Sequence, residues 1–327
     1  MSKLIVIIGA TGGQGGSVLK TFLSDPEYRV RGITRNPDSG KSQDLKRQGV
    51  EVVKADIGDE ASLDKAFEGA YAIFAITDYY ETFFSKGKDV AMETEFQNGC
   101  NLARAASRVP TLRRYIWSTL PFTSHFSGGQ AIVPHFEGKA RVDQYIKDNL
   151  PGLLKKATFA IFGIFSDNLL AYSIFKPIWL ESAKKWVQFW PAPPEAPFHS
   201  LADHKVNSGV FVHAIISNDT LEGGTYVTCI VEDLTLASAL EIWGRASGKA
   251  PEPGSTAVVT IPVEQYATLW GAMGEEQASQ WIFFSYMQSL GVTSLPGVVD
   301  GLSLLSEEEK KSLETTEQSW TKIQDRL

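Results

Sequence analysis

Cysteine is scarce in this sequence. Only Cys100 and Cys229 occur among its 327 residues, too few for the disulfide framework that stabilises small secreted domains. Long apolar runs are also missing. No stretch approaches the ~20 residues that span a bilayer, and the run at 4–8 is too short for a secretory signal. We therefore expect a soluble, cytoplasmic protein that does not enter membranes.

The chain has no excess of basic residues. It contains 31 lysines and arginines against 38 aspartates and glutamates, a net charge of −7. Proteins that bind nucleic acid usually carry a positive surface, and the short basic clusters around Lys46 and Lys184 are typical of solvated faces. We therefore expect no direct binding to nucleic acid, and we assign no metal ligands.

What the sequence does contain is a regular alternation of apolar strands and amphipathic helices. Runs rich in β-branched and aromatic residues predict six strands, at 4–8, 29–34, 50–55, 71–76, 115–118 and 157–162. The segments between them predict helices, and this alternation is typical of βαβ units in a doubly wound parallel sheet. Continuously apolar strands fit a sheet that is covered on both faces.

The pattern changes after about residue 165. Aromatic residues and prolines gather at 166–199, a helix is predicted at 203–216, and the chain from 231 onward is interpreted as helical with one short strand at 260–262. Residues 306–309 have the spacing of a capping box, which predicts a terminal helix. We expect an α/β fold with a Rossmann domain and a smaller, interleaved, mostly α lobe. The Rossmann domain is 1–165 with a return segment at about 200–230, and the lobe is 166–199 with 231–327.

A glycine-rich loop follows the first strand. Its glycines are spaced as G-x-x-G-x-x-G, and a helix comes after it. Glycine allows the tight turn, the approach of backbone N–H groups to a pyrophosphate, and close packing of the helix on the strand. The positive end of the helix dipole then faces the anion. The alternative is a glycine-rich turn without a ligand. The residues assigned to the dinucleotide phosphates are Gly9, Thr11, Gly12, Gly13, Gln14 and Gly15.

The end of the second strand indicates which dinucleotide binds. An NAD site usually has an acidic residue there for the ribose 2′-OH, but this chain has Arg35 followed by Asn36. A guanidinium suits a 2′-phosphate in both geometry and charge, so we predict NADP(H). A surface arginine in a turn is the alternative. Because ligands lie outside the carboxyl ends of parallel strands, the next two strand ends are also assigned to the cofactor, through Asp56, Ile57, Thr77 and Asp78.

Several motifs together resemble the NmrA-like family, an atypical branch of the short-chain dehydrogenase/reductase superfamily. The resemblance covers about the first half of the chain well. It implies an NADP-binding fold whose C-terminal lobe shapes a cleft over the nicotinamide. The family includes redox-sensing regulators without activity, proteins similar to isoflavone-type reductases, and members of fungal natural-product pathways. The motifs are Gly9-Ala-Thr-Gly-Gly-Gln-Gly-Gly-Ser17, Thr34-Arg-Asn-Pro37, Gly69-Ala-Tyr-Ala-Ile-Phe74, His135-Phe-Glu-Gly-Lys139 and Phe165-Ser-Asp-Asn168.

The superfamily's catalytic Tyr-x-x-x-Lys pair is incomplete. Lys139 is retained and is assigned to the cofactor, but His135 stands in the place of the tyrosine. Imidazole titrates near neutral pH, so His135 is a candidate acid, although it also fits a capping or packing role after a proline. Ser118 lies where the superfamily has its catalytic serine, or simply ends its strand. A literal Tyr-x-x-x-Lys at 172–176 follows the sixth strand and is interpreted as a coincidence.

Residues after the sixth strand are expected beside the nicotinamide. Phe162, Gly163 and Phe165 are assigned to the cofactor, and Asn168 to the substrate. Aromatic side chains elsewhere are candidates for an apolar pocket, although aromatics at helical spacing more often form the core. These candidates are Tyr79, Tyr80, Trp190, Phe198 and the run 281–286.

Two functional hypotheses remain open. The first is an NADP(H)-dependent enzyme that reduces a C=O, C=C or C=N bond of a bulky, apolar, aromatic or polycyclic small molecule in a biosynthetic pathway. A non-redox reaction with NADP as a structural element is equally compatible with the missing tyrosine. The second hypothesis is a regulator that senses NADP⁺/NADPH and binds a protein partner.

Overall fold

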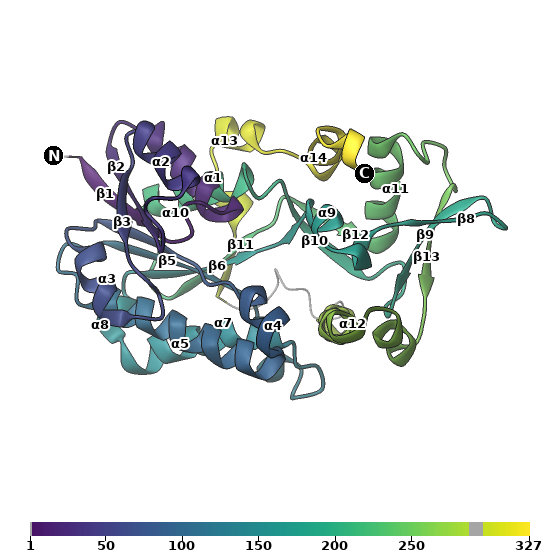
Figure 1. The fold of residues 1–327 in the computed structure, drawn as a ribbon, viewed down its shortest axis with the longest axis horizontal. Helices are drawn as coiled ribbons and strands as arrows, with labels where there is room; N and C mark the ends of the chain where they lie inside the picture. Colours follow the sequence, from purple (N-terminus) through teal and green to yellow (C-terminus); the bar gives the residue numbers. More distant parts are fainter. Residues whose placement is uncertain (1, 288–296) are drawn as a thin grey trace.

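The computed structural model describes residues 2–287 and 297–327. Its main sheet has eight strands in the order β14-β11-β6-β5-β4-β1-β2-β3 (Figure 1), and every neighbouring pair is parallel. The strand order reverses between β1 and β4, which is where doubly wound sheets bind ligands. The strands are β1 (Lys3–Ile7), β2 (Tyr28–Thr34), β3 (Glu51–Lys54), β4 (Ala72–Ala75), β5 (Arg114–Thr119), β6 (Ala157–Phe162), β11 (Thr225–Cys229) and β14 (Val298–Asp300).

Helices cover both faces of this sheet. Successive residues of a strand point to opposite faces, so Leu4 and Val6 enter one core with α3, α5 and α7, and Ile5 and Ile7 enter another with α1 and α10. The two-sided burial explains why β1 is continuously apolar. The helices are α1 (Gly13–Leu23), α2 (Gly40–Arg47), α3 (Glu60–Phe67), α4 (Tyr80–Lys86), α5 (Lys88–Ser107), α6 (Thr123–Phe126), α7 (Pro134–Asn149), α8 (Pro151–Leu154) and α10 (Asn207–Ser217).

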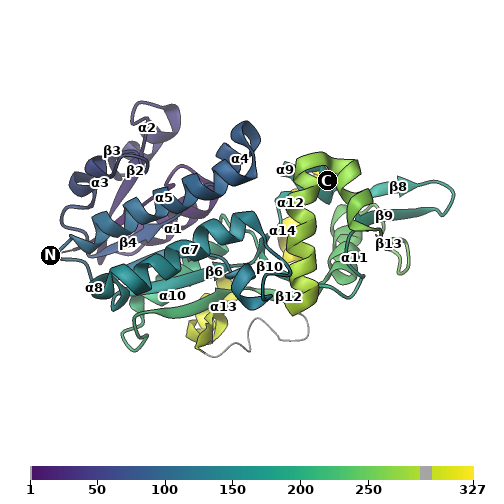
Figure 2. The same cartoon turned by 90° about the horizontal axis from the view of Figure 1, so that it is seen from below.

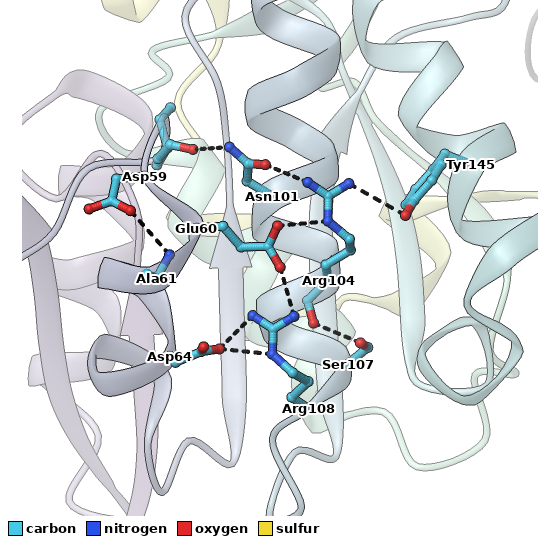
Figure 3. Close-up of polar contacts among 10 residues, drawn as sticks. Asp59, Glu60, Ala61, Asp64, Asn101, Arg104, Ser107, Arg108 and Tyr145 are labelled. Atoms are coloured by element: carbon cyan, nitrogen blue, oxygen red, sulfur yellow. Dashed lines mark hydrogen bonds and ion pairs between the residues drawn. The ribbon is translucent and has the colours of Figure 1, made fainter.

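An ion-pair network fixes the outer edge of one helical layer. Glu60 on α3 accepts from Arg104 on α5 and from Arg108, the residue that follows α5, each at 2.7 Å. Arg104 also contacts Asn101 and Tyr145 (Figure 3). The Asn101 amide in turn donates to the carbonyl of Ile57 at 2.9 Å. The network therefore holds the loop after β3, which carries part of the predicted cofactor site.

The second lobe has its own aromatic core and lies beyond the carboxyl ends of the main strands. Two three-stranded sheets, β12-β10-β7 and β13-β9-β8, build it together with α11 and α12. Helix α12 stands between the two bodies (Figure 2) and bends at Gly271, where φ is +57°. The elements are β7 (Ile164–Phe165), α9 (Asn168–Ala171), β8 (Ile178–Leu180), β9 (Lys185–Trp190), β10 (Pro197–Ala202), β12 (Glu232–Thr235), α11 (Leu236–Ser247), β13 (Thr256–Thr260), α12 (Val263–Met287), α13 (Glu307–Ser312) and α14 (Thr316–Thr321), with short 3₁₀ turns at Ser173–Phe175, Gly301–Leu304 and Gln324–Arg326.

The six strands predicted in the first half are confirmed within one or two residues, and so is the capping box between Ser306 and Glu309. The predicted strand at 260–262 was wrong, because β13 ends at Thr260. The second lobe also contains more strand than the sequence predicted. Aromatic residues such as those of β9 suit strands, but they do not distinguish strand from buried helix. Within the described part of the chain, no helix is long and apolar enough to span a membrane.

The C-terminal segment joins the two bodies, although the sequence predicted that all residues from 231 onward belong to the second lobe. The chain leaves the lobe to place β14 beside β11 in the main sheet. It then returns along α13 and α14, and Trp320 on α14 donates from Nε1 to the carbonyl of Ser166 at 2.8 Å. The C-terminal segment therefore crosses the boundary twice.

Candidate functional site

One cleft of about 980 Å³ runs along the carboxyl ends of the main strands and under the second lobe. Each residue that the sequence assigned to catalysis, cofactor or substrate lines it. The reason is topological, since parallel strands end at the same edge of a sheet and their following loops meet there. The structure therefore brings the assigned residues together, while their individual roles stay predictions.

The glycine loop forms the floor of the cleft at the N-terminus of α1. Gly9 has φ at +70°, and a Cβ on Gly15 would overlap the carbonyl oxygens of Ile8 and Gly9. The first N–H groups of a helix have no partner within it, and Gly12, the N-cap of α1, offers them no side-chain cap. These donors face the cleft at the positive end of the helix dipole, and they fit a pyrophosphate.

Arg35 lies at the mouth of the cleft, where the sequence predicted a 2′-phosphate ligand. Its guanidinium forms a two-pronged ion pair with Glu81 on α4, at 3.0 and 3.1 Å. Both side chains are largely exposed, at 66% and 58%. Nearby, Asp56 and Asn36 also line the cleft and accept from backbone N–H groups in their own turns. An arginine at this position fits a 2′-phosphate, although Glu81 competes for it.

Lys139 is held by two partners at the centre of the cleft. Its Nζ lies 2.9 Å from Oε1 of Glu95, which is fully buried, and it donates to the hydroxyl and carbonyl oxygens of Thr77 at 3.0 and 3.1 Å. The buried ion pair neutralises the ammonium charge and fixes its position. Sequence reasoning did not find Glu95, because it lies in the middle of α5 without any motif around it.

His135 is fixed by helix α12 of the second lobe. Its Nδ1 lies 2.6 Å from Oε1 of Glu276, which also accepts from the His135 backbone N–H at 3.0 Å. Its Nε2 lies 3.1 Å from Oε1 of Gln280. Tyr79 donates to the other Glu276 oxygen at 3.1 Å, and burial together with the charge of Glu276 raises the pKa of Tyr79, so the phenol stays protonated. Glu276 therefore orients both rings.

Ser118 and Thr119 end β5 on the wall of the cleft. The Gln14 amide donates to the Ser118 hydroxyl at 3.1 Å, which links the glycine loop to this strand. Thr119 donates to Asp143 at 2.7 Å, and Tyr226 donates to the same carboxylate at 3.0 Å. Burial raises the pKa of Asp143 to about 7. The Thr119 hydroxyl proton is therefore committed to Asp143, whereas the Ser118 hydroxyl, which accepts from Gln14, can still donate to a ligand.

The far end of the cleft is aromatic. Tyr80 and Tyr172 face one another with ring centroids 5.7 Å apart, and Phe175 and Phe284 complete the wall. Three other aromatic candidates from the sequence lie in the core of the second lobe, as the alternative interpretation expected, because their side chains are almost fully buried. These are Trp190, Phe198 and Trp281.

The tyrosine of the second Tyr-x-x-x-Lys sequence does reach the cleft. Tyr172 lines it next to Asn168, but Lys176, four residues later, is exposed. The pair therefore does not act as a unit, which agrees with its interpretation as a coincidence. Sequence reasoning nevertheless missed Tyr172 as a wall residue, since its element had no predicted relation to the sheet.

Further cleft residues come from the second lobe and from the turn between β10 and α10. Gln277 donates to the Tyr80 hydroxyl at 3.2 Å, and His199 lines the cleft with its Nδ1 2.7 Å from Asp233. His204 lines the cleft beside the glycine loop. None of these residues lies in a motif, and their neighbours in the sequence are equally polar, so the sequence held no signal that could have found them.

The sequence model of the NmrA-like family matches residues 1–281. The chain belongs to this family. An NmrA-like family domain-containing oxidoreductase of Aspergillus hancockii is 28% identical over 211 residues, which cover 62% of this chain and 61% of that protein. A domain-containing protein of the same family from Dictyostelium discoideum is 27% identical over 255 residues, covering 76% and 79%.

Solved structures of two kinds have this fold. NmrA, a negative transcriptional regulator, in complex with NADP has a TM-score of 0.72 at 20% identity, covering 99% of this chain and 96% of that chain. A Citrobacter triphenylmethane reductase complexed with NADP(H) has a TM-score of 0.65 at 15% identity, covering 98% and 99%. Identities this low establish the fold, which regulators and reductases share.

Proposed function

We propose that this protein is an NADP(H)-dependent reductase that acts on a bulky, largely apolar aromatic molecule. The observation that carries the proposal is the single continuous cleft. At one end it offers unpaired N–H groups and an arginine, and at the other an aromatic wall with histidine and glutamine side chains. Relatives named as NmrA-like oxidoreductases, including those of Aspergillus hancockii and Penicillium ochrochloron, support the reaction class.

Each central residue has a proposed role. The first turn of α1 holds the pyrophosphate, Arg35 holds the 2′-phosphate, and Lys139 holds the nicotinamide ribose. The reduced cofactor, when bound, would supply a hydride, which together with one proton from the protein completes the reduction. His135 supplies the proton from Nε2 when a substrate oxygen or nitrogen replaces Gln280 as its acceptor, while Glu276 keeps Nδ1 protonated and the ring in place.

The experiment is turnover with NADPH and a panel of aromatic ketones, enones and cyclic imines, followed by absorbance and mass. Once a substrate is found, His135→Ala is expected to lower turnover about a hundredfold or more, the usual scale for a general acid. His125→Ala serves as the control, since that histidine lies on α6 outside the cleft lining. Full activity of His135→Ala would contradict the catalytic role of His135, but it would leave the reductase proposal standing.

A regulator that senses the NADP⁺/NADPH ratio is the second candidate. Two observations favour it: both ring nitrogens of His135 already have internal partners, and the Lys139 ammonium is neutralised by Glu95. Absence of turnover across the panel, together with a large difference in affinity between oxidised and reduced cofactor, would replace the enzyme by the sensor. Turnover without net oxidation of NADPH would instead indicate a non-redox reaction on the same site.

A further inference from the structure

His204 lies directly over the glycine loop, in the turn between β10 and α10. A Cβ placed on Gly13 would overlap the Nε2 atom of His204. The imidazole therefore fills the space that a side chain at residue 13 would otherwise take, beside the first turn of α1. The sequence assigned Gly13 to the cofactor phosphates, and the structure places a histidine ring against it.

The turn that carries His204 is firmly held. Phe165 stacks on the imidazole with centroids 4.3 Å apart and planes 7° from parallel. Ser17 of α1 donates to the carbonyl of Val206 and accepts from the N–H of Gly209, both at 2.8 Å. Ala202, just before the turn, has φ at +60°, a conformation that costs energy for a residue with a Cβ. The ring is thus fixed relative to α1.

His204 is 8% exposed, and the protein leaves one of its ring nitrogens without a hydrogen bond. Nδ1 is buried and has no hydrogen-bond partner, although Oδ1 of Asp167 lies 3.3 Å away. Lys205 donates from Nζ to the other oxygen of Asp167 at 2.7 Å. Burial lowers the pKa of His204, Asp167 and Asp203 oppose this shift, and Lys205 adds to it. Despite the nearby Asp167, the ring is therefore neutral at neutral pH when no phosphate is bound.

We propose that His204 is a ligand of the cofactor pyrophosphate and that it takes up a proton when the cofactor binds. The pyrophosphate oxygens, held by the first turn of α1, come next to Nε2, and their negative charge favours the imidazolium. The proton comes from solvent and stays on Nε2, which donates it in a charge-assisted hydrogen bond to a phosphate oxygen. Asp167 then faces the second N–H of the cation.

This inference rests on the proposed NADP(H) site but not on turnover. Because the bound state holds more protons than the free state, the affinity for NADP⁺ falls as pH rises between the two pKa values of His204. A site made only of backbone N–H groups adds no titrating group of its own, so a pH dependence could then come only from elsewhere, for example from the 2′-phosphate of the ligand, which titrates at about pH 6. The difference in pH dependence between wild type and a His204 variant therefore separates a histidine ligand from a glycine loop acting alone.

The test is calorimetry of the full-length protein with NADP⁺ at about pH 6.5 and about pH 8.5, in buffers of different ionisation enthalpy. We expect wild type to take up a fraction of a proton and to bind more weakly at the higher pH. His204→Gln should abolish the uptake and weaken binding roughly tenfold at the lower pH, the scale of one hydrogen bond to a charged group, with little effect at the higher pH.

Matched controls locate the effect. His125→Gln changes a histidine on α6 that lies outside the cleft lining, and it should bind NADP⁺ as wild type does. Adenosine 2′-monophosphate lacks a pyrophosphate, so its affinity should not change in His204→Gln. Equal proton uptake in wild type and His204→Gln, or equal weakening for both ligands, would overturn the inference. If wild type binds no NADP⁺ at all, the proposed function fails with it.

Discussion

At the residue scale, the pairing of Arg35 with Glu81 has a consequence for cofactor choice. A 2′-phosphate must take Arg35 away from Glu81, and the carboxylate then remains near the phosphate charge. The pair is exposed, and exposed ion pairs contribute at most about 1 kcal/mol. Glu81 therefore moderates a preference for NADP(H) that Arg35 creates.

We predict that Glu81→Gln strengthens NADP⁺ binding roughly threefold and leaves NAD⁺ binding unchanged, as measured by calorimetry at low salt. Arg35→Ala should weaken NADP⁺ far more than NAD⁺. Glu51→Gln is the matched control, because Glu51 pairs with Arg31 at 3.0 Å and does not line the cleft. Equal effects of Arg35→Ala on both cofactors would refute the assignment of Arg35.

At the element scale, α7 carries a polar stripe through the middle of the molecule. His135, Lys139 and Asp143 are four residues apart, so they lie on one face of the helix. Each is buried, and each has a partner from a different element: Glu276 from α12, Glu95 from α5, and Thr119 from β5. Helix α7 therefore fixes the positions of the main sheet, helix α5 and the second lobe relative to one another.

Asp143 gives a prediction about stability and pH. Burial raises its pKa from 3.8 to about 7, so the folded state binds a proton that the unfolded state has released. The protonated carboxyl of Asp143 therefore makes its full contribution to stability below about pH 4, and this contribution is lost as pH rises to about 7. In urea unfolding, Asp143→Asn should therefore gain stability relative to wild type, by about 1 kcal/mol or more, between about pH 5 and about pH 8. A constant difference across that range would contradict a buried, titrating Asp143.

At the scale of the whole molecule, the C-terminal segment ties the two bodies together. Trp320 on α14 is 3% exposed, belongs to the core of the second lobe, and donates to Ser166 beside the cleft. The segment also brings Glu309 of α13 within 3.4 Å of His213 on α10. The cleft thus depends on residues at the end of the chain.

We predict that Trp320→Ala lowers the free energy of unfolding by about 3–5 kcal/mol, the usual cost of removing a buried tryptophan. It should also weaken NADP⁺ binding, since Ser166 adjoins Phe165 at the cleft. Trp179→Ala is the control, because Trp179 is 43% exposed and its loss should change thermal unfolding by little. Comparable destabilisation by the two variants would show that α14 does not hold the two bodies together.

The sequence predicted the parts of this protein that depend on neighbouring residues. The strands of the first half, the glycine loop and the end of β2 could be predicted because local periodicity and turn chemistry specify them. Since parallel strands end at one edge, it also followed that Asp56, Thr77 and Ser118 would meet. The lobe was less predictable, because the aromatic run of β9 fits strand and buried helix equally well.

The sequence by itself determined that this chain forms a Rossmann sheet with a site for a dinucleotide, since those features are written in short, contiguous patterns. Only the tertiary structure decided what surrounds that site. Glu276 lies 141 residues from His135, and His204 lies still further from Gly13 along the chain. No local pattern records such contacts, because the packing of the second lobe against the sheet creates the first and the packing of α10 on α1 creates the second.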